Sequence, residues 1–275
     1  MAVGLMVVLC GAIGCSSLGS LSPLLPLERK LIYYPTKMPP EIQVPESSGI
    51  QDVNFQSADG TQLHGWFMDH PQRRAVALWL HGNAGNIAGR IETLRLLNER
   101  HKLAVMIFDY RGYGRSEGKP NERGILMDAR AARRWLSDRT EVGQSDIVLM
   151  GRSLGGGVAV DLAANDGARG LVLASTFTSL PQAANHHFPL LPTSVLMTQR
   201  LDSLAKINRY HGPLLQSHGT ADKVIPYAMG QQLFEKANEP KRFISIPDGG
   251  HNDPQSPEYR DAFDQFIDRL PPVGS

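Results

Sequence analysis

Cysteine is almost absent from this chain of 275 residues. Its two cysteines, Cys10 and Cys15, both lie within the first fifteen residues, and the rest of the chain contains none. The body of the protein therefore has no disulfide framework, no cysteine-based zinc cluster and no cysteine nucleophile.

An excess of either charge is also lacking. The chain carries 28 lysines and arginines against 27 aspartates and glutamates, which gives a net charge of +1. A nucleic-acid-binding protein would show a basic surplus on some stretch, so this balance argues against nucleic acid as a partner. Hydrophobic residues make up 41% of the chain and charged residues 20%, a composition that excludes a disordered protein and favours a globular one.

The first 14 residues, MAVGLMVVLCGAIG, contain no charged side chain. This apolar run is shorter than the roughly 20 residues that a transmembrane helix needs. Small residues lead directly to Cys15 and a polar stretch follows it, which resembles the signal peptide of a bacterial lipoprotein. The resemblance implies cleavage after residue 14, lipidation of Cys15 and export to the periplasmic face of a bacterial membrane or to the outer membrane. The alternatives are a short helical anchor and an ordinary secretory signal, which would leave a soluble periplasmic or secreted protein.

Residues 15–49 are expected to form a tether and a Pro-rich segment that leads into one domain, residues 50–272. Within that domain, short apolar runs such as AVALWL (75–80) predict strands that are covered on both faces. Between them, apolar residues at helical spacing predict helices, for example over 87–100 and 123–139. Eight strands are expected, at 51–57, 62–67, 75–80, 103–108, 146–150, 170–174, 213–216 and 242–246.

Strands that alternate with helices indicate an α/β fold with a mostly parallel central sheet and helices on both faces. The first two strands surround an Asp-Gly turn and predict an antiparallel hairpin at the edge of the sheet. Residues 177–210 do not fit the alternation, so we expect them to form a small cap inserted after the sixth strand. Six apolar residues of this insertion could cover a pocket or pack on the core: Phe188, Leu190, Leu191, Val195, Leu196 and Met197.

The strongest chemical signal is the sequence GRSLG at 151–155, which directly follows the strand expected at 146–150. A G-x-S-x-G motif between a strand and a small-residue helix is typical of a nucleophile elbow, a sharp turn that exposes the serine. An ordinary glycine-rich turn is the alternative. The N-terminus of the following helix would add positive potential beside the serine oxygen. Ser153 is therefore the candidate nucleophile.

A serine nucleophile needs a base, and the base needs an acid that orients it. His251 follows the last expected strand, at the sheet edge where open α/β sheets place their sites. Asp222 follows the preceding strand, which gives the chain order Ser, Asp, His of the α/β hydrolases. Asp248 and Asp253 flank the histidine within one tight loop, where turn and capping roles suit them better.

A tetrahedral intermediate needs two N–H donors for its oxyanion. The backbone amide of Leu154, directly after the nucleophile, is the first candidate. The amide of Asn83, in the glycine-rich loop after the strand at 75–80, is the second. The loop 109–116 is expected to brace this oxyanion loop.

The motifs HGNAGN, DYRGYGRSEG, GRSLGG, HGTADKVIP and GGHND occur in this order along the chain. Together they resemble the membrane-associated abhydrolase-domain branch of the α/β-hydrolase superfamily, which is similar to acyl-protein thioesterases and bacterial carboxylesterases. The resemblance covers about residues 50–270. It implies a serine hydrolase that cleaves acyl esters or thioesters, of lipids or acylated proteins, through an acyl-enzyme with no cofactor or metal.

Two other functions are compatible with these motifs. An amidase or peptidase would use the same triad of Ser153, Asp222 and His251. A non-catalytic lipoprotein could keep the fold as a binding surface, but it would be expected to have lost part of the triad, and all three positions are intact. The sequence does not indicate the acyl chain length or the oligomeric state.

Overall fold

The structure is a computed structural model that describes residues 25–39, 41–44 and 48–274. The expected signal segment, Cys15 and the first part of the expected tether lie outside these residues. Within the described part of the chain, no helix is both long and apolar enough to cross a membrane.

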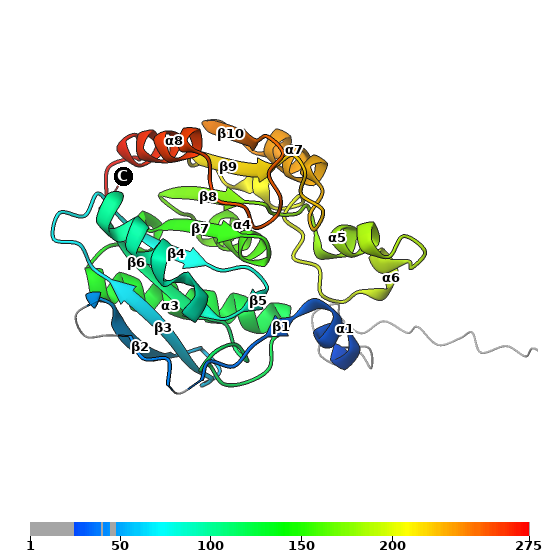
Figure 1. Cartoon of the computed structure of the whole chain (residues 1–275), viewed down its shortest axis with the longest axis horizontal. Coiled ribbons are helices and arrows are strands. Elements are labelled where there is room, and N and C mark those ends of the chain that lie inside the picture. Colours follow the sequence, from blue (N-terminus) through cyan, green and yellow to red (C-terminus); the bar gives the residue numbers. More distant parts are fainter. Residues whose placement is uncertain (1–24, 40, 45–47, 275) are drawn as a thin grey trace, which may run out of the picture.

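An eight-stranded sheet forms the centre of the molecule (Figure 1). Its spatial order is β10-β9-β8-β7-β4-β6-β3-β2; β3 pairs antiparallel with both β2 and β6, and the strands from β6 to β10 pair in parallel. This confirms the α/β class and the antiparallel hairpin at the edge. The strands are β2 (Gln51–Gln56), β3 (Gln62–Met68), β4 (Ala75–Leu80), β6 (Leu103–Asp109), β7 (Val148–Arg152), β8 (Gly170–Ala174), β9 (Leu214–Gly219) and β10 (Lys241–Ile246).

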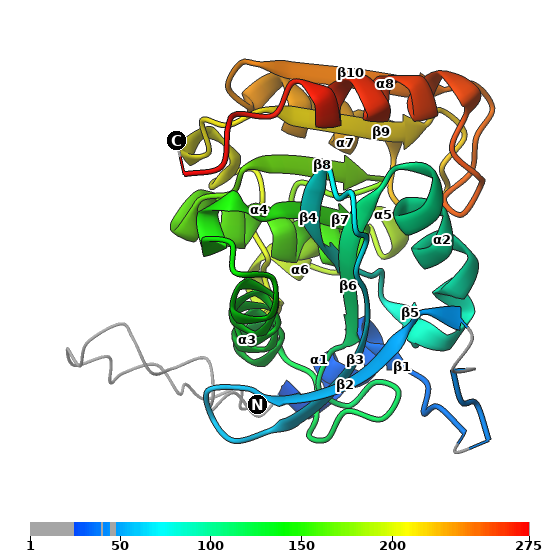
Figure 2. The same cartoon turned by 90° about the vertical axis from the view of Figure 1, so that its left-hand side faces the viewer.

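Helices cover both faces of the sheet, as the buried strands require. The helices α3 (Glu122–Thr140), α4 (Leu154–Asp166) and α7 (Tyr227–Lys236) pack on one face. The other face carries η3 (Ile87–Arg90), α2 (Ile91–Arg95), the π-helical turn η4 (Leu96–Arg100) and α8 (Pro257–Asp268). Figure 2 shows α3 and α4 on one side of the sheet and α2 on the other.

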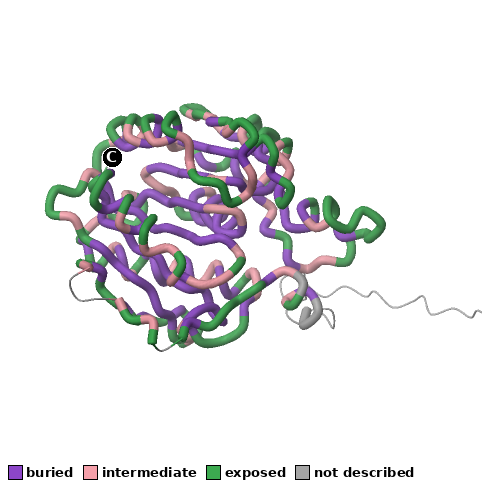
Figure 3. Tube along the Cα trace, viewed as in Figure 1, coloured by how far each residue is buried: buried purple, intermediate pink, exposed green. Residues whose placement is uncertain are grey.

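The burial of β4 on both faces explains why its sequence is a continuous apolar run. Leu78 belongs to the core on the α3 side, whereas its neighbours Ala77 and Trp79 belong to the core on the α2 side. Successive side chains of a strand point to opposite faces, so a strand covered on both faces favours an apolar residue at every position. Figure 3 shows the central strands as buried and the outer surfaces of the helices as exposed.

Two expected strands differ from the observed strands by more than one residue, and one expected helix differs in type. The strand expected at 146–150 begins two residues later, because residues Gln144–Asp146 form a 3₁₀ turn, η5. The strand expected at 213–216 continues to Gly219. The single helix expected over 87–100 is a 3₁₀, an α and a π segment in succession, which bury Ile87, Leu94 and Leu97 respectively.

The segment before the domain is more ordered than a tether. It forms the helix α1 (Leu25–Ile32) and the strand β1 (Tyr34–Pro35), which pairs with β5 (Ala84–Gly85). The buried carboxylate of Glu28 accepts hydrogen bonds from the backbone N–H groups of Thr198, at 2.7 Å, and Gln199, at 3.2 Å. The helix α1 is thereby attached to the insertion that follows β8.

That insertion contains the helices α5 (Leu180–His187) and α6 (Thr193–Leu196) and the 3₁₀ turn η6 (Ile207–Arg209). In Figure 1, α5 and α6 project from the side of the molecule toward which the arrowheads of β8 and β9 point. The insertion therefore stands at the carboxyl edge of the parallel strands, where α/β proteins place their sites.

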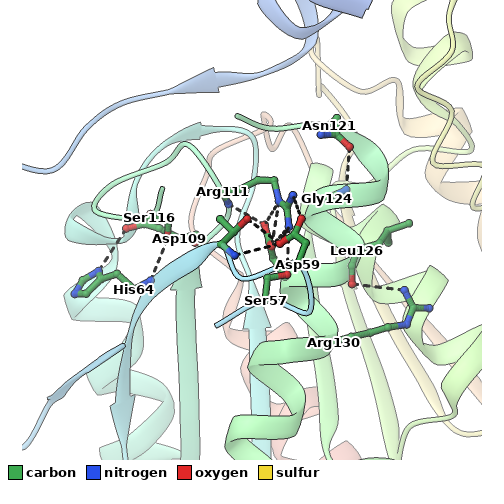
Figure 4. Close-up of polar contacts among 12 residues, drawn as sticks. Ser57, Asp59, His64, Asp109, Arg111, Ser116, Asn121, Gly124, Leu126 and Arg130 are labelled. Carbon is green, nitrogen blue, oxygen red and sulfur yellow. Dashed lines mark hydrogen bonds and ion pairs between the residues drawn. The ribbon is translucent and has the colours of Figure 1, made fainter. Parts of the chain in front are cut away.

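The loop after β6 is held in place by a buried ion pair. Arg111 donates to Asp128 of α3 at 2.7 Å and to Asp59 of the β2–β3 turn at 2.8 Å (Figure 4). The hydroxyl of Ser116 donates to the Asp109 carbonyl and accepts from the backbone N–H of His64, at 3.0 Å. These contacts fix both ends of the loop 109–116, which faces the site described next.

Candidate active site

Ser153 occupies a strained turn between β7 and α4. Its backbone has φ +50° and ψ −117°, a conformation that costs a residue with a side chain on the order of 1–3 kcal/mol. Close packing holds the turn there. A Cβ atom on Gly155 would lie 2.0 Å from the Leu80 carbonyl oxygen, and one on Gly151 would lie 2.4 Å from the Gly155 carbonyl oxygen. Only glycine fits at either position, and the motif G-x-S-x-G therefore follows from packing.

His251 and Asp222 meet through two loops that bind each other. The backbone N–H of Ala221, after β9, donates to the Gly249 carbonyl, after β10, at 3.0 Å. This contact places Nδ1 of His251 at 2.8 Å from Oδ2 of Asp222. The Asp222 side chain has no exposed surface and that of His251 is 11% exposed. The structure thus brings together the acid and the base that were expected from their positions in the chain.

The carboxylate of Asp222 is surrounded by donors. Its Oδ1 accepts from the backbone N–H groups of Val224, at 2.8 Å, and Ile225, at 2.9 Å. Nε2 of buried His218 lies 3.2 Å from Oδ2. Burial alone would raise the pKa of Asp222, but hydrogen bonds from His218 and His251 hold that pKa well below its usual range. Asp222 is therefore ionised, and it can hold Nδ1–H of His251 and leave Nε2 free.

Asp248 and Asp253 have the loop roles that their positions suggested. The Asp253 carboxylate accepts from the backbone N–H of Gly250 at 2.7 Å, and the Asp248 side chain is exposed, with φ +54°. The structure records no hydrogen bond or ion pair between either carboxylate and the His251 ring in the described chain.

The loop after β4 lies against Ser153, the candidate nucleophile. A Cβ atom on Gly82 would be 3.5 Å from the Cβ atom of Ser153. The side-chain oxygen of Asn83 accepts from the Tyr34 N–H, at 3.2 Å, and from the Tyr113 hydroxyl, at 2.8 Å. These bonds fix the loop while leaving the Asn83 backbone amide available. Leu154 is the first residue of α4, where backbone N–H groups have no partner within the helix.

A buried carboxylate and a buried histidine support this loop from below. Oδ1 of Asp109 accepts from the backbone N–H of Ile87 at 3.0 Å, and lies 3.9 Å from Nε2 of His81. The His81 ring is fully buried beneath Tyr110, whose hydroxyl donates to the His81 carbonyl at 3.2 Å. Burial lowers the pKa of His81 to about 4, so this ring is neutral at pH 7.

Ser153, Leu154, Asn83 and His251 all line one cavity of about 610 Å³. One wall is apolar and comes from α1, from the segment after β8 and from α5–α6: Ile32, Phe177, Leu180, Ala183, Phe188 and Met197. Another part of the lining carries two arginines, Arg90 and Arg152. In the described chain, no group of three or more His, Cys, Asp or Glu side chains is arranged to hold a metal ion.

Only part of the expected apolar cap faces this cavity. Of the six apolar residues named for the cap, Phe188 and Met197 line it. The side chains of Leu190 and Val195 are instead 95% and 80% exposed, and Leu191 and Leu196 are also exposed. Two short helices present one side to the cavity, and the tip between them extends beyond the body of the protein.

Several cavity residues were not expected from the sequence, among them Ile32, Arg90 and Arg152. Only the fold brings Arg90 and Ile32 to the cavity that contains Ser153. Arg152 lies within the GRSLG motif, so its place in the cavity could have been predicted. In a tightly packed turn, a charged side chain next to the candidate nucleophile needs open space, and the cavity provides it.

Residues 78–198 match a protein family whose description is "alpha/beta hydrolase fold". The chain is 36% identical over 249 residues to YfhR of Escherichia coli K12, across 86% of this chain and 84% of that protein. It is 34% identical over 258 residues to the alpha/beta hydrolase domain-containing protein WAV2 of Arabidopsis thaliana, across 84% and 83% of the two chains. This chain belongs to the α/β-hydrolase family.

Solved structures show the same fold at low sequence identity. An esterase of Pyrococcus furiosus superposes with a TM-score of 0.71 at 20% identity, covering 86% of this α/β hydrolase and 99% of the esterase. Acetyl xylan esterase 1 of a Thermoanaerobacterium species superposes with a TM-score of 0.64 at 19% identity, covering 90% and 98%. The expected fold is confirmed by these matches together with the sheet order.

The contact between Asp222 and His251 generates a first prediction. Asp222→Asn keeps the shape of the side chain but favours the wrong imidazole tautomer, a change that lowers kcat by about 10⁴ in a serine protease. We expect a loss of that order in kcat for a chromogenic ester, with a nearly unchanged melting temperature. Asp248→Asn and Asp253→Asn are the matched controls and should stay within about tenfold of the wild type, the scale of one lost hydrogen bond. Near-normal turnover by Asp222→Asn would disprove the proposed acid.

Burial of His81 generates a second prediction, on pH. Its folded pKa of about 4 lies below the ordinary value of 6.5, so between these values the unfolded chain binds a proton that the folded protein does not. Stability should therefore fall as the pH falls from about 7 to 4, by roughly 3 kcal/mol from this group alone. His81→Gln should flatten that part of the pH dependence of the unfolding free energy, measured in urea. His186→Gln changes an exposed histidine and should leave it unaltered. An equal slope in His81→Gln and the wild type would contradict the assignment.

Proposed function

We propose that this α/β hydrolase is a serine hydrolase that cleaves esters or thioesters of apolar acyl groups through an acyl-enzyme. One observation carries the proposal. Ser153 is held in a strained turn and lines the same cavity as His251, whose Nδ1 is hydrogen bonded to an ionised, buried carboxylate. This is the arrangement that turns a serine hydroxyl into a nucleophile.

The reaction follows from the positions of these groups. Oγ of Ser153 attacks the acyl carbon while Nε2 of His251 takes the hydroxyl proton. The backbone N–H groups of Asn83 and Leu154 donate to the oxyanion. The bond to the leaving oxygen or sulfur then breaks, and His251 returns the proton to that atom. A water molecule attacks the acyl-enzyme with the same base, releasing the carboxylic acid and the free serine.

The cavity supports an acyl group as the substrate. Its apolar wall, which includes Phe177, Leu180 and Met197, begins beside the nucleophile and gives an apolar chain a place to be removed from water. Two structural neighbours are named esterases, which supports the same chemistry on this fold. The apolar wall favours a thioester or ester of a fatty or short-chain acid.

Removing the nucleophile tests this proposal. A fluorophosphonate probe reacts with activated serines, so it should label the wild type and fail to label Ser153→Ala. In a serine protease the loss of the nucleophile costs on the order of 10⁶ in kcat, and a comparable loss is expected here for aryl esters and acyl thioesters. Ser175→Ala is the control, because Ser175 also follows a strand at this edge of the sheet and has positive φ.

Each outcome of that experiment bears on the function. Labelling of Ser175→Ala and not of Ser153→Ala supports the assigned nucleophile. Equal labelling of Ser153→Ala and the wild type would assign the reaction to another residue. A folded wild type that neither reacts with the probe nor hydrolyses any ester or thioester would overturn the proposal that the protein is a hydrolase.

A further inference from the structure

Two positively charged side chains, Arg90 and Arg152, line the catalytic cavity, and neither has a carboxylate within ion-pair distance in the described chain. Arg90, at the end of η3, donates to the Ala84 carbonyl at 3.3 Å, and its Nε is buried without a partner. Arg152, at the end of β7, donates to the carbonyl of His251. In the described part of the chain, neither guanidinium lies within ion-pair distance of an acidic side chain.

Two other arginines of this protein, Arg111 and Arg74, are each balanced by two carboxylates. Arg111 pairs with Asp59 and Asp128, and Arg74 pairs with Asp264 and Asp268, both at 2.7 Å. Arg90 and Arg152 differ from these because their open side is the cavity that contains Ser153.

The two charges also oppose each other. Burial lowers the pKa of Arg90, and the charge of Arg152 lowers it further. Burial lowers the pKa of Arg152 as well, and the more distant Asp222, Tyr259 and Asp253 offset part of this effect. Two partly desolvated cations beside one cavity are unfavourable on their own, and an anion bound between them would offset both the burial and the repulsion.

The arginines and the apolar wall belong to different parts of the fold. The apolar wall comes from α1, the segment after β8 and α5–α6, whereas Arg90 directly precedes α2 and Arg152 ends β7 (Figure 2). Arg152 also lines a second cavity of about 400 Å³, which extends between α2–η4 and α8 and shares Asn252 with the first. A substrate can therefore place an apolar part toward the cap and a polar part toward α2 and α8.

One of the two cations contacts the residue that protonates the leaving group in the proposed reaction. His251 returns its proton to the leaving group in that reaction, and Arg152 donates to the backbone carbonyl of this same histidine. The cationic end of the cavity therefore adjoins His251.

We propose that Arg90 and Arg152 bind an anionic group, a carboxylate or a phosphate, on the leaving group of the substrate; this proposal rests on the proposed hydrolase function. The preferred substrate is then amphiphilic, with an apolar acyl chain against the cap and an anionic alcohol or thiol against α2 and α8. Guanidinium groups suit both anions because their N–H donors match carboxylate and phosphate oxygens in pairs.

Matched substrate pairs test this specificity. Each pair has one butyryl ester with an anionic leaving group and one with the same group methylated: 4-butyryloxybenzoate with its methyl ester, and 4-butyryloxyphenyl phosphate with its dimethyl ester. The quantity measured is the ratio of kcat/KM between the anionic and the neutral member. It is compared between the wild type and the variants Arg90→Gln, Arg152→Gln and the double variant.

We expect the double variant to lower this ratio by about tenfold or more, as the loss of charged hydrogen bonds would. The pair with the larger drop identifies carboxylate or phosphate as the favoured anion. Arg95→Gln is the matched control, because Arg95 lies on α2 but does not line either cavity, and it should leave the ratio unchanged. An unchanged ratio in the double variant for both pairs would overturn the proposal.

Two further measurements separate this proposal from the proposed function and from misfolding. Hydrolysis of the neutral esters by the wild type reports the hydrolase function alone, so its failure would refute that function and not merely the anion preference. Arg90→Lys keeps the charge, and it should retain more of the ratio than Arg90→Gln at an equal melting temperature. In the wild type, NaCl should lower the ratio by screening the anionic substrate. A ratio that does not respond to salt, with equal effects of Lys and Gln, would also overturn the proposal.

Discussion

The contact of the Gly155 backbone with the end of β4 is the constraint on which the site depends. A side chain at Gly155 would overlap the Leu80 carbonyl, so α4 can begin this close to β4 only with glycine at that position. Ser153, two residues before Gly155, has positive φ and lies against the loop that contains Asn83. The packing of α4 against β4 therefore fixes the position of Ser153 relative to the candidate oxyanion donors.

The order of the strands explains why distant residues reach this point. β4 and β7 are neighbours in the sheet, so the loops after them meet at its carboxyl edge. β9 and β10 follow on the other side of β8, and their loops hydrogen bond to one another and carry Asp222 and His251. The buried carboxylates of Asp109 and Asp222 hold these loops from two sides, the first below the Asn83 loop and the second behind the histidine.

Site residues could be predicted where the local sequence identifies them, and they could not be predicted where only the fold brings them to the site. Ser153 lies in a motif whose glycines are required by packing, and Asp222 and His251 follow apolar strands at the expected edge. By contrast, Arg90 and Ile32 become cavity residues only because η3 and α1 pack beside the elbow. The helix α1 gave little signal, since its eight residues are held by Glu28 and the distant residues Thr198 and Gln199. The exposure of the tip near Leu190 could not be predicted either, because the sequence does not indicate whether an apolar side chain faces a pocket or water.

The central claim of this account is that an acyl-enzyme forms on Ser153, and detecting this intermediate is the most direct test. The intermediate can be trapped by rapid quench of a reaction with a p-nitrophenyl ester and detected by mass spectrometry of the intact protein and of its peptides. The account predicts a burst of p-nitrophenol equal to the enzyme concentration and an acyl adduct on the peptide that contains Ser153, as covalent catalysis requires. Steady hydrolysis without a burst or adduct, when the deacylation step is slowed by low temperature, would contradict it, as would an adduct on any other residue.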